Sequence, residues 1–437
     1  MTKFIFKGAF ISLLLLVLSA GLLMASGQKE AAATGPVTLN HWTFIDPAGD
    51  NVRSKAHAYV QKTFMEKNPN IQIKVNVVGW QQLDPMLVRA AASGEVPDTS
   101  MIYHPSLSMH VNAGSIQPLD PYVKDWNDAK KNDFVAPWSA TVIGGKKWGF
   151  HYDHRVTGMM YRQDLLDQAG IAFPKDLGEM AETAKKLHNP PNMVGILSGV
   201  NSKNPMTVIE WAMPIAYSEG GILLAEDGKT KVDSPAWAKT LDYWKKLVHE
   251  YKVLPQDLAL AHSDEAQSVF ISGKGVFHIQ SSHRLGFSRD KSGLGDKIQY
   301  RAIPSFKAGK TSPLAIFGWI LVMPKGAKNP DAAIKFIDHF ISPEMQAHLA
   351  ENATYTPVRK SALDFPWFKT EAAKDVRNFM EMAAANPLQP LVIPEQSNEL
   401  LTGVGKAWES VIMSPGQVTP EQALKQAADD YNSKYAK

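Results

Sequence analysis

The sequence predicts an α/β protein of two lobes, each built from a mainly parallel sheet flanked by helices. The chain has 437 residues, and at about 150 residues per domain this length predicts two or three domains. Hydrophobic residues make up 44% and charged residues 20% of the chain, as in ordinary globular proteins. Segments with strand and helix patterns alternate along it, which is typical of a parallel sheet with crossover helices.

The first part of the chain shows this alternation most clearly. Residues 71–77 alternate strictly between apolar and polar side chains, which predicts a strand, and residues 51–67 carry apolar residues at intervals of four, which predicts a helix. Asp84 and Pro85 are typical of a helix N-cap and first helical position. In order, we expect a strand at 37–42, a helix at 51–67, a strand at 71–77, a helix from 85 closed by Gly94, a strand at 99–103 and a helix at 107–113.

The same order continues in the rest of the chain. Asp233, Ser234 and Pro235 predict the start of a long helix, and residues 419–422 form a capping box with proline at the first helical position. Two α/β lobes account for the length better than one very large sheet. The further expected elements are strands at 157–161, 276–279 and 318–323 and helices at 177–187, from 235, from 330 and from 420.

The N-terminus has the pattern of an exported protein. Two lysines precede an uncharged apolar run from Gly8 to Ala25, and small residues follow. This predicts a signal peptide over residues 1–27, a polar tether over residues 28–35 and a periplasmic or other extracytoplasmic location. Ser26 stands where a lipoprotein signal would carry its cysteine, so no lipid-bearing cysteine is expected. The alternative is a retained membrane anchor, although the run is marginal for a span of roughly 20 residues.

Composition excludes several classes of function. The chain contains no cysteine, which excludes disulfide frameworks, thiolate zinc sites, iron–sulfur clusters and cysteine nucleophiles. The formal net charge is +3 and no basic cluster is visible, whereas a nucleic-acid-binding protein of this size is usually more basic. We therefore expect no nucleic-acid partner.

The chain carries no recognisable enzyme motif. HExxH, GxSxG, Walker-loop and GxGxxG patterns are all missing from the sequence. His151 and His154 leave metal binding open, but imidazoles that make hydrogen bonds at a pocket edge account for them more simply. We expect no catalytic residues, no metal and no cofactor. The clustered histidines are His41, His104, His151, His154, His278 and His283.

Tryptophan gives a more specific indication. Of the 11 tryptophans, several lie at loops or at the ends of predicted strands, whereas Trp244 follows a helical stripe and is expected in a core. A single loop tryptophan often fills a core as well. Several at strand ends together favour a cleft lined by flat aromatic faces. They are Trp42, Trp80, Trp148 and Trp319.

A series of short motifs then resembles one known family. Residues 90–98, AAASGEVPD, resemble its AxAxGxxPD segment, and residues 113–120, AGSIQPLD, resemble its AGxLxPLD segment. Further matches, to GKxYGxP…LYYNKDLFxxAGL, FxxGKxAM, GG…AAxxF…SPExQ and PVR, lie at residues 145–150 with 160–171, at 270–276, at 318–346 and at 356–359. Here His151 replaces the usual proline and Arg162 the usual asparagine. In this order, the motifs resemble the extracellular solute-binding proteins, family 1, of ABC transporters, the sugar-binding type that includes maltose-binding protein.

The resemblance implies the two-lobed fold of type II periplasmic binding proteins, with a hinge that the chain crosses three times. We place these crossings near residues 149–155, 279–283 and 319–324. The first lobe would then contain residues 36–150 and 282–322, and the second lobe residues 151–281 and 323–437. Ligand would bind between the lobes, outside the carboxyl ends of the strands.

Carried over position by position, the resemblance also implies a set of ligand-binding residues. They follow the first three strands, lie at the three crossings, or, for Trp211, stand near an aromatic position of the second lobe. The set is Trp42, Asp46, Trp80, Gln81, His104, Tyr152, Asp153, Arg155, Trp211, Ser281, Ser282, His283, Gly318 and Trp319.

The implied function is the substrate-binding component of an ABC importer. The protein, a monomer, would capture a carbohydrate by hinge closure and deliver it to the membrane permease subunits. Aromatic walls and polar edge groups suit a neutral mono- or oligosaccharide. Two alternatives remain open: a binder of an anionic solute, such as a glycerol phosphate or a uronate-containing sugar that Arg155 would hold, and a secreted carbohydrate-active enzyme.

Overall fold

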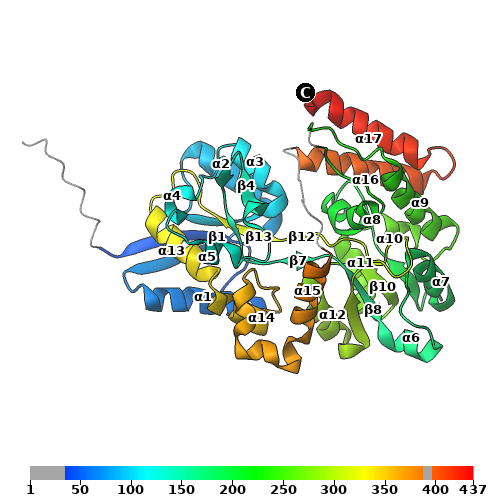
Figure 1. Ribbon diagram of the computed structural model, residues 1–437, viewed down its shortest axis with the longest axis horizontal. Helices are drawn as coiled ribbons and strands as arrows, with labels where there is room; N and C mark the ends of the chain where they lie inside the picture. The colour runs from blue at the N-terminus through cyan, green and yellow to red at the C-terminus, as the bar shows by residue number, and fades with distance from the viewer. Residues whose placement is uncertain (1–34, 226, 387–395, 437) are drawn as a thin grey trace, which may run out of the picture.

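Two α/β lobes lie side by side in the protein (Figure 1). This computed structural model describes residues 35–225, 227–386 and 396–436. One sheet has the strand order β2-β1-β3-β13-β6 and the other β11-β8-β10-β9. The predicted two-lobed α/β class is confirmed. The expected signal peptide at 1–27 and all of the expected tether except Gly35 lie outside the described residues.

The first lobe is a three-layer sandwich. Helices with apolar faces cover both sides of its sheet: α1, α13 and α14 pack on one side, and α2 and α3 on the other. Its strands are β1 (Val37–Thr43), β2 (Ile71–Val77), β3 (Thr99–Tyr103), β6 (Phe150–His151) and β13 (Trp319–Val322). Its helices are α1 (Val52–Lys67), α2 (Trp80–Ser93), α3 (Leu107–Asn112), α4 (Asp120–Val123), α5 (Asp128–Asn132), α13 (Pro330–Phe340) and α14 (Pro343–Ala353), beside a hairpin of β4 (Val142–Ile143) and β5 (Lys146–Lys147).

The second lobe repeats this layering around a four-stranded sheet. Its larger core lies between the sheet and helices α7, α8, α9 and α16, and α11 and α12 cover the other face. The strands are β8 (Met159–Arg162), β9 (Val194–Leu197), β10 (Gly275–Ile279) and β11 (Ile298–Arg301). The helices are α6 (Gln163–Ala169), α7 (Leu177–Leu187), α8 (Met213–Ser218), α9 (Pro235–His249), α10 (Gln256–Ala259), α11 (Ser263–Ile271), α12 (Leu285–Ser292), α16 (Ser397–Met413) and α17 (Pro420–Tyr435).

Strand directions depend on how each strand enters its sheet. β1, β2 and β3 are parallel, as the alternating order predicts, but β13 runs antiparallel to β3 and to β6. In the second sheet only the β9–β10 pair is parallel, so the prediction of a mainly parallel sheet in each lobe is wrong for the second lobe. β1, β2 and β3 follow one another through the helices α1 and α2, and such crossovers keep strands parallel, whereas β13, β6 and β8 lie beside crossings between the lobes.

Two short antiparallel strands connect the lobes: β7 (Arg155–Val156) and β12 (Ile316–Phe317), which we call the hinge strands. The chain leaves the first sheet after β6, passes through β7 to β8, and returns through β12 to β13. The crossing expected at 149–155 is therefore confirmed, and the one expected at 319–324 occurs just before Trp319.

The crossing expected at 279–283 is wrong. After β10 the chain continues into α12 and β11, and β11 pairs with β8 of the second sheet. Residues up to the hinge strand β12 thus belong to the second lobe, whereas the expected boundaries gave 282–322 to the first. Conversely, α13 and α14 pack on the first lobe, although 323–437 were assigned to the second. No local pattern in β10 decides between the two paths, and the long-range pairing of β11 with β8 does.

A single helix, α15 (Lys374–Ala385), makes the third connection. Val376 packs with residues of α14 in the first lobe, whereas Phe379 and Ala383 pack with Tyr300 of β11 in the second. Asn378 also donates a hydrogen bond to the Tyr300 carbonyl at 3.3 Å. The two sides of α15 are therefore buried in different lobes.

Most predicted elements are confirmed, and the start of α2 shows why one is not. This helix begins at Trp80, and Pro85 lies inside it. Leu83, before the proline, is fully buried together with Leu87. Burying that first leucine stabilises a turn that the local start signal at Asp84 and Pro85 did not include.

Candidate functional site

The chain segments beside the hinge strands approach each other closely at a glycine. Gly318 has φ 151°, in the region that favours glycine. A Cβ atom at this position would lie 2.2 Å from the Asp153 carbonyl oxygen. The predicted site residue Gly318 is thus required by the backbone of the hinge and fixes the spacing of the two crossings.

Aromatic rings from three strand ends of the first lobe gather beside the hinge strands. The ring centroids of Phe44 and Trp319 are 4.2 Å apart, and those of Tyr103 and Trp319 are 5.3 Å apart. Tyr103 also contacts Phe317 of β12 edge to face, at 6.2 Å. Trp319 is buried and its Nε1 has no described partner. The carboxyl ends of β1 and β3 therefore present an aromatic surface, as expected for this kind of sheet edge.

A buried charge pair lies at the first crossing. The Arg155 Nε donates to Asp153 Oδ2 at 3.4 Å, and the Arg155 guanidinium lies 6.0 Å from the centre of the Tyr103 ring. Burial raises the pKa of Asp153, and the nearby charges of Arg155 and Arg53 offset part of that rise. Asp153 Oδ1 has no described partner. The hinge thus places an arginine against the aromatic surface and holds it there.

The second lobe contributes a carboxylate from an unusual helix turn. Val208–Ala212 form a π-helix. Four of its five residues are fully buried, whereas Glu210, in the middle, keeps some exposed surface. Burial raises the pKa of Glu210 to about 7, and Arg155 offsets part of the rise. Burial also raises the pKa of Tyr103, and the charge of Glu210 adds to this. We refer to Phe44, Tyr103, Arg155, Glu210 and Trp319 as the junction cluster.

Other polar groups of the second lobe lie behind this carboxylate. Arg284 donates to Asp264 at 2.7 Å, and the charges of this pair act on Glu210. Ser281 Oγ and His283 Nδ1 are buried without a described partner, and burial holds the pKa of His283 well below its usual value, with help from Arg155. Ser282 Oγ instead accepts a hydrogen bond from the Val156 amide at 3.2 Å, so it serves the hinge.

The structure separates the predicted site residues into groups. Arg155, Asp153, Gly318, Trp319, Ser281, Ser282 and His283 surround the hinge strands as described above. Tyr152 and Trp211, in contrast, are fully buried in the cores of the first and second lobes. Both were expected at the ligand, and in this structure neither presents surface to one.

The remaining predicted residues lie at the end of the first lobe. Trp80 is the first residue of α2 and is 51% exposed, with exposed Gln81 beside it. Trp42 is partly buried against both cores that flank the first sheet. Asp46 is exposed and accepts a hydrogen bond from the Ala48 amide. His104 is buried against the Ala140 carbonyl oxygen at 3.0 Å.

Three of the clustered histidines contact one another edge to face in the first lobe. The ring centroids of His104 and His151 are 4.5 Å apart, and those of His151 and His154 are 5.1 Å apart. Burial lowers the pKa of His104 to about 4 and that of His154 to about 3, so these rings are neutral near pH 7. Within the described part of the chain, no group of three or more histidine or acidic side chains is arranged to hold a metal ion.

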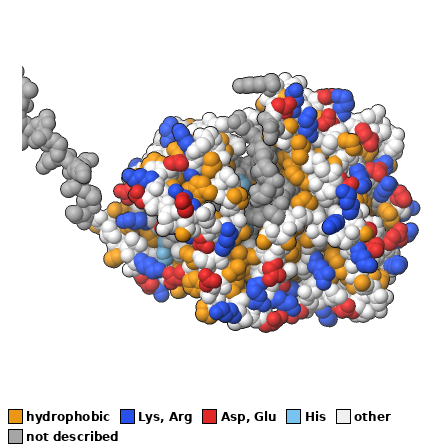
Figure 2. All heavy atoms as spheres, in the orientation of Figure 1, with side chains coloured by type: hydrophobic (Ala, Val, Ile, Leu, Met, Phe, Trp, Pro, Cys, Tyr) orange, Lys and Arg blue, Asp and Glu red, His pale blue; other side chains and the backbone are white. Residues whose placement is uncertain are grey.

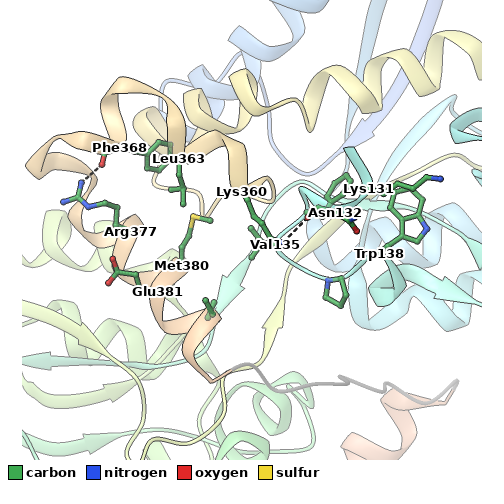
Figure 3. Close-up of a pocket in the computed structure, with 14 residues that line it drawn as sticks. Lys131, Asn132, Val135, Trp138, Lys360, Leu363, Phe368, Arg377, Met380 and Glu381 are labelled. Carbon is green, nitrogen blue, oxygen red and sulfur yellow. Dashed lines mark hydrogen bonds between the residues drawn. The ribbon is translucent and has the colours of Figure 1, made fainter. Parts of the chain in front are cut away.

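A separate cavity of about 900 Å³ lies between the first lobe and α15. Figure 3 shows Trp138 and Val135 on one side of it and Met380 and Glu381 of α15 on the other. None of the 14 predicted site residues lines it. The cavity is therefore distinct from the junction cluster.

Comparison of the chain with known protein families agrees with this arrangement of two lobes around a hinge. A family model described as "Bacterial extracellular solute-binding protein" matches residues 60–376, which is most of the chain. The protein belongs to this family. The resemblance read from its motifs is thus confirmed.

Relatives of this solute-binding protein are distant but cover most of its length. A putative binding protein of Brucella abortus is 25% identical over 378 residues, 84% of this chain and 87% of that protein. The arabinooligosaccharide-binding protein of Bacillus subtilis is 23% identical over 336 residues, 74% of this chain and 73% of the relative. Among solved structures, maltose-bound MalE3 of T. maritima has a TM-score of 0.77 at 22% identity, covering 91% of this chain and all of that one. The mannotriose-bound CpMnBP1 has a TM-score of 0.71.

The junction cluster contains residues that the sequence did not single out. Phe44 and Tyr103 follow or end the predicted strands, so their position at strand ends was a usable signal. No such signal marks Glu210, because nothing in the local sequence indicates a π-helix. Each helix in the described ranges is too short or too polar to span a membrane, and Figure 2 shows acidic and basic side chains interspersed over the visible face.

Proposed function

We propose that this solute-binding protein is the extracytoplasmic component of an ABC importer and captures a neutral carbohydrate between its lobes. The observation that carries this proposal is the junction cluster, in which aromatic groups of the first lobe and a carboxylate of the second meet at the hinge strands. The printed descriptions of relatives and structural neighbours name arabinooligosaccharide, maltose and mannotriose, which supports the class of ligand.

Capture proceeds by closure of the lobes around the hinge strands. A ligand that contacts both lobes binds the closed form better than the open form, so binding shifts the population toward closure. The closed monomer then docks on the membrane permease. No bond of the ligand is made or broken, and the protein acts as a binding protein rather than an enzyme.

The charges at the junction favour a neutral ligand over an anionic one. Arg155 shares its Nε–H with buried Asp153 and lies against the Tyr103 ring, so part of its donor capacity is occupied. Glu210 faces the same space and repels a carboxylate or phosphate when it is ionised. An anionic ligand would need a guanidinium group that is free to donate, because arginine normally binds a carboxylate or phosphate through two parallel N–H groups.

Calorimetric titration with a panel of sugars tests this proposal. Maltotriose, mannotriose and an arabinotriose serve as neutral probes, and trigalacturonate serves as the anionic probe. We expect at least one neutral sugar to bind, to be recovered unchanged, and to reduce the radius of gyration in solution scattering. Binding of trigalacturonate alone, or recovery of a cleaved sugar, would contradict the proposal.

A further inference from the structure

The π-helix of the second lobe leaves one charged side chain partly exposed. Val208, Ile209, Trp211 and Ala212 are all fully buried in the larger core of the second lobe. Glu210, in the middle of the same turn, is partly exposed. A π-helix turn is rare and occurs frequently at functional sites. This turn hides its tryptophan and presents its carboxylate.

Groups from several elements surround the Glu210 carboxylate. The charge of Glu210 acts on Tyr103 of β3, and the charges of Arg155 of β7 and of Arg284 and Asp264 in its own lobe act on Glu210. Tyr300 of β11 also lies within reach of its charge. The groups that interact electrostatically with Glu210 are therefore two cations, one further carboxylate and two phenols.

Glu210 has no partner among these groups. Arg155 donates to Asp153 and Arg284 donates to Asp264, and no hydrogen bond or ion pair joins the Glu210 side chain to another described residue. A carboxylate that is largely removed from water without a donor is unfavourable. Glu210 is partly exposed, so water is the donor to its carboxylate in the absence of a partner among the described residues, and a ligand at the junction can replace that water.

We propose that Glu210 is a ligand-contacting carboxylate that accepts hydrogen bonds from two neighbouring hydroxyl groups of a neutral sugar when the lobes close. This inference rests on the proposed function. A carboxylate offers two oxygens that accept in parallel, and adjacent hydroxyl groups on a sugar ring present two donors at matching spacing. Glu210 then selects for a diol on the second-lobe side, opposite the aromatic surface of the first lobe.

The test compares Glu210→Gln with Glu219→Gln. Gln keeps the size of the side chain but has one acceptor oxygen and no charge. Glu219 is a matched control because it is on the same lobe, at the end of α8, and pairs with Lys239 at 2.8 Å. The probe is whichever neutral trisaccharide of the panel binds the wild type most tightly. We expect Glu210→Gln to weaken its binding about ten- to a hundredfold and Glu219→Gln to leave it unchanged.

The pH dependence of the wild type gives a second readout that needs no variant. Ionised Glu210 accepts hydroxyl donors better than the protonated form, so affinity should rise between pH 5.5 and pH 8.0. In Glu210→Gln this rise should disappear. A variant affinity within twofold of wild type, or a wild-type affinity that is flat or falls with pH, would overturn the role of Glu210 and leave the proposed function intact. If no sugar of the panel binds the wild type, both fail together.

Discussion

The two lobes present different surfaces to the junction between them. The first lobe offers Phe44, Tyr103 and Trp319, which pack on one another at strand ends. The second offers Glu210, Ser281 and His283, whose polar atoms lack described partners in whole or in part. The aromatic surface is already stabilised by its own contacts, whereas the polar groups gain most of theirs from a ligand. We infer that the first lobe provides the platform in the open form and that the second lobe discriminates between ligands on closure.

The largest effect is expected where the two lobes are held together. Gly318→Ala would place a Cβ atom 2.2 Å from the Asp153 carbonyl oxygen at a φ of 151°, so we expect the free energy of unfolding to fall by about 3 kcal/mol or more. Urea denaturation of wild type and variant measures this free energy of unfolding. Gly403→Ala is the control, because its Cβ would only touch Ala427 at 3.6 Å. If Gly318→Ala is as stable as the control, the lobes do not depend on this close approach.

The next largest effect is expected in the pH dependence of the free energy of unfolding, through Glu210 of the second lobe. Burial raises the pKa of Glu210 from 4.5 to about 7, so the unfolded chain ionises first as pH rises. The stability that protonated Glu210 contributes is therefore fully present below pH 4.5. As pH rises from 4.5 to about 7, the free energy of unfolding falls by about 2 to 3 kcal/mol.

The Glu210→Gln variant tests this by difference. Because glutamine does not titrate, the variant should be as stable as wild type near pH 4 and more stable near pH 8. Thermal unfolding at the two pH values, with Glu219→Gln alongside, separates this effect from general acid sensitivity. An equal difference at both pH values would show that Glu210 is not the group responsible.

The smallest effect concerns the exposed edge of the platform. Trp80 is 51% exposed at the start of α2 in the first lobe. If it extends the aromatic platform, Trp80→Ala should weaken sugar binding by about 1 kcal/mol while changing stability by less than about 0.5 kcal/mol. Phe287→Ala, at a 43% exposed position of the second lobe, is the control and should change neither. Unchanged binding in Trp80→Ala would confine the platform to the junction cluster.

Local sequence patterns predicted the elements of the fold well, because their signals lie within each segment. The capping box at Thr419 and Gln422 forms as expected, and so does the left-handed end of α2 at Gly94. Lobe boundaries were predicted less well. Whether residues 298–301 join the first or the second sheet depends on pairing with β8, more than 130 residues earlier, and no local pattern carries that information.

The candidate site shows the same limit at the scale of a single residue. The resemblance places Trp211 at the ligand because it stands near an aromatic position of the second lobe, whereas no motif marks its neighbour Glu210. The π-helix buries the indole in the core and leaves the carboxylate partly exposed. A shift of one residue therefore exchanges a stacking group for a charged acceptor, and the helix type that sets this shift arises from tertiary packing.

The attachment of α15 to both lobes limits how they can move. The hinge strands tie the lobes at one place, and α15 ties them again through Val376 on one side and Phe379 on the other. Two rigid bodies joined at separated points cannot slide or twist freely, and they keep one easy rotation, about the line through those points. The lobes are therefore expected to open and close by rotation about a single axis that passes through the hinge strands and α15.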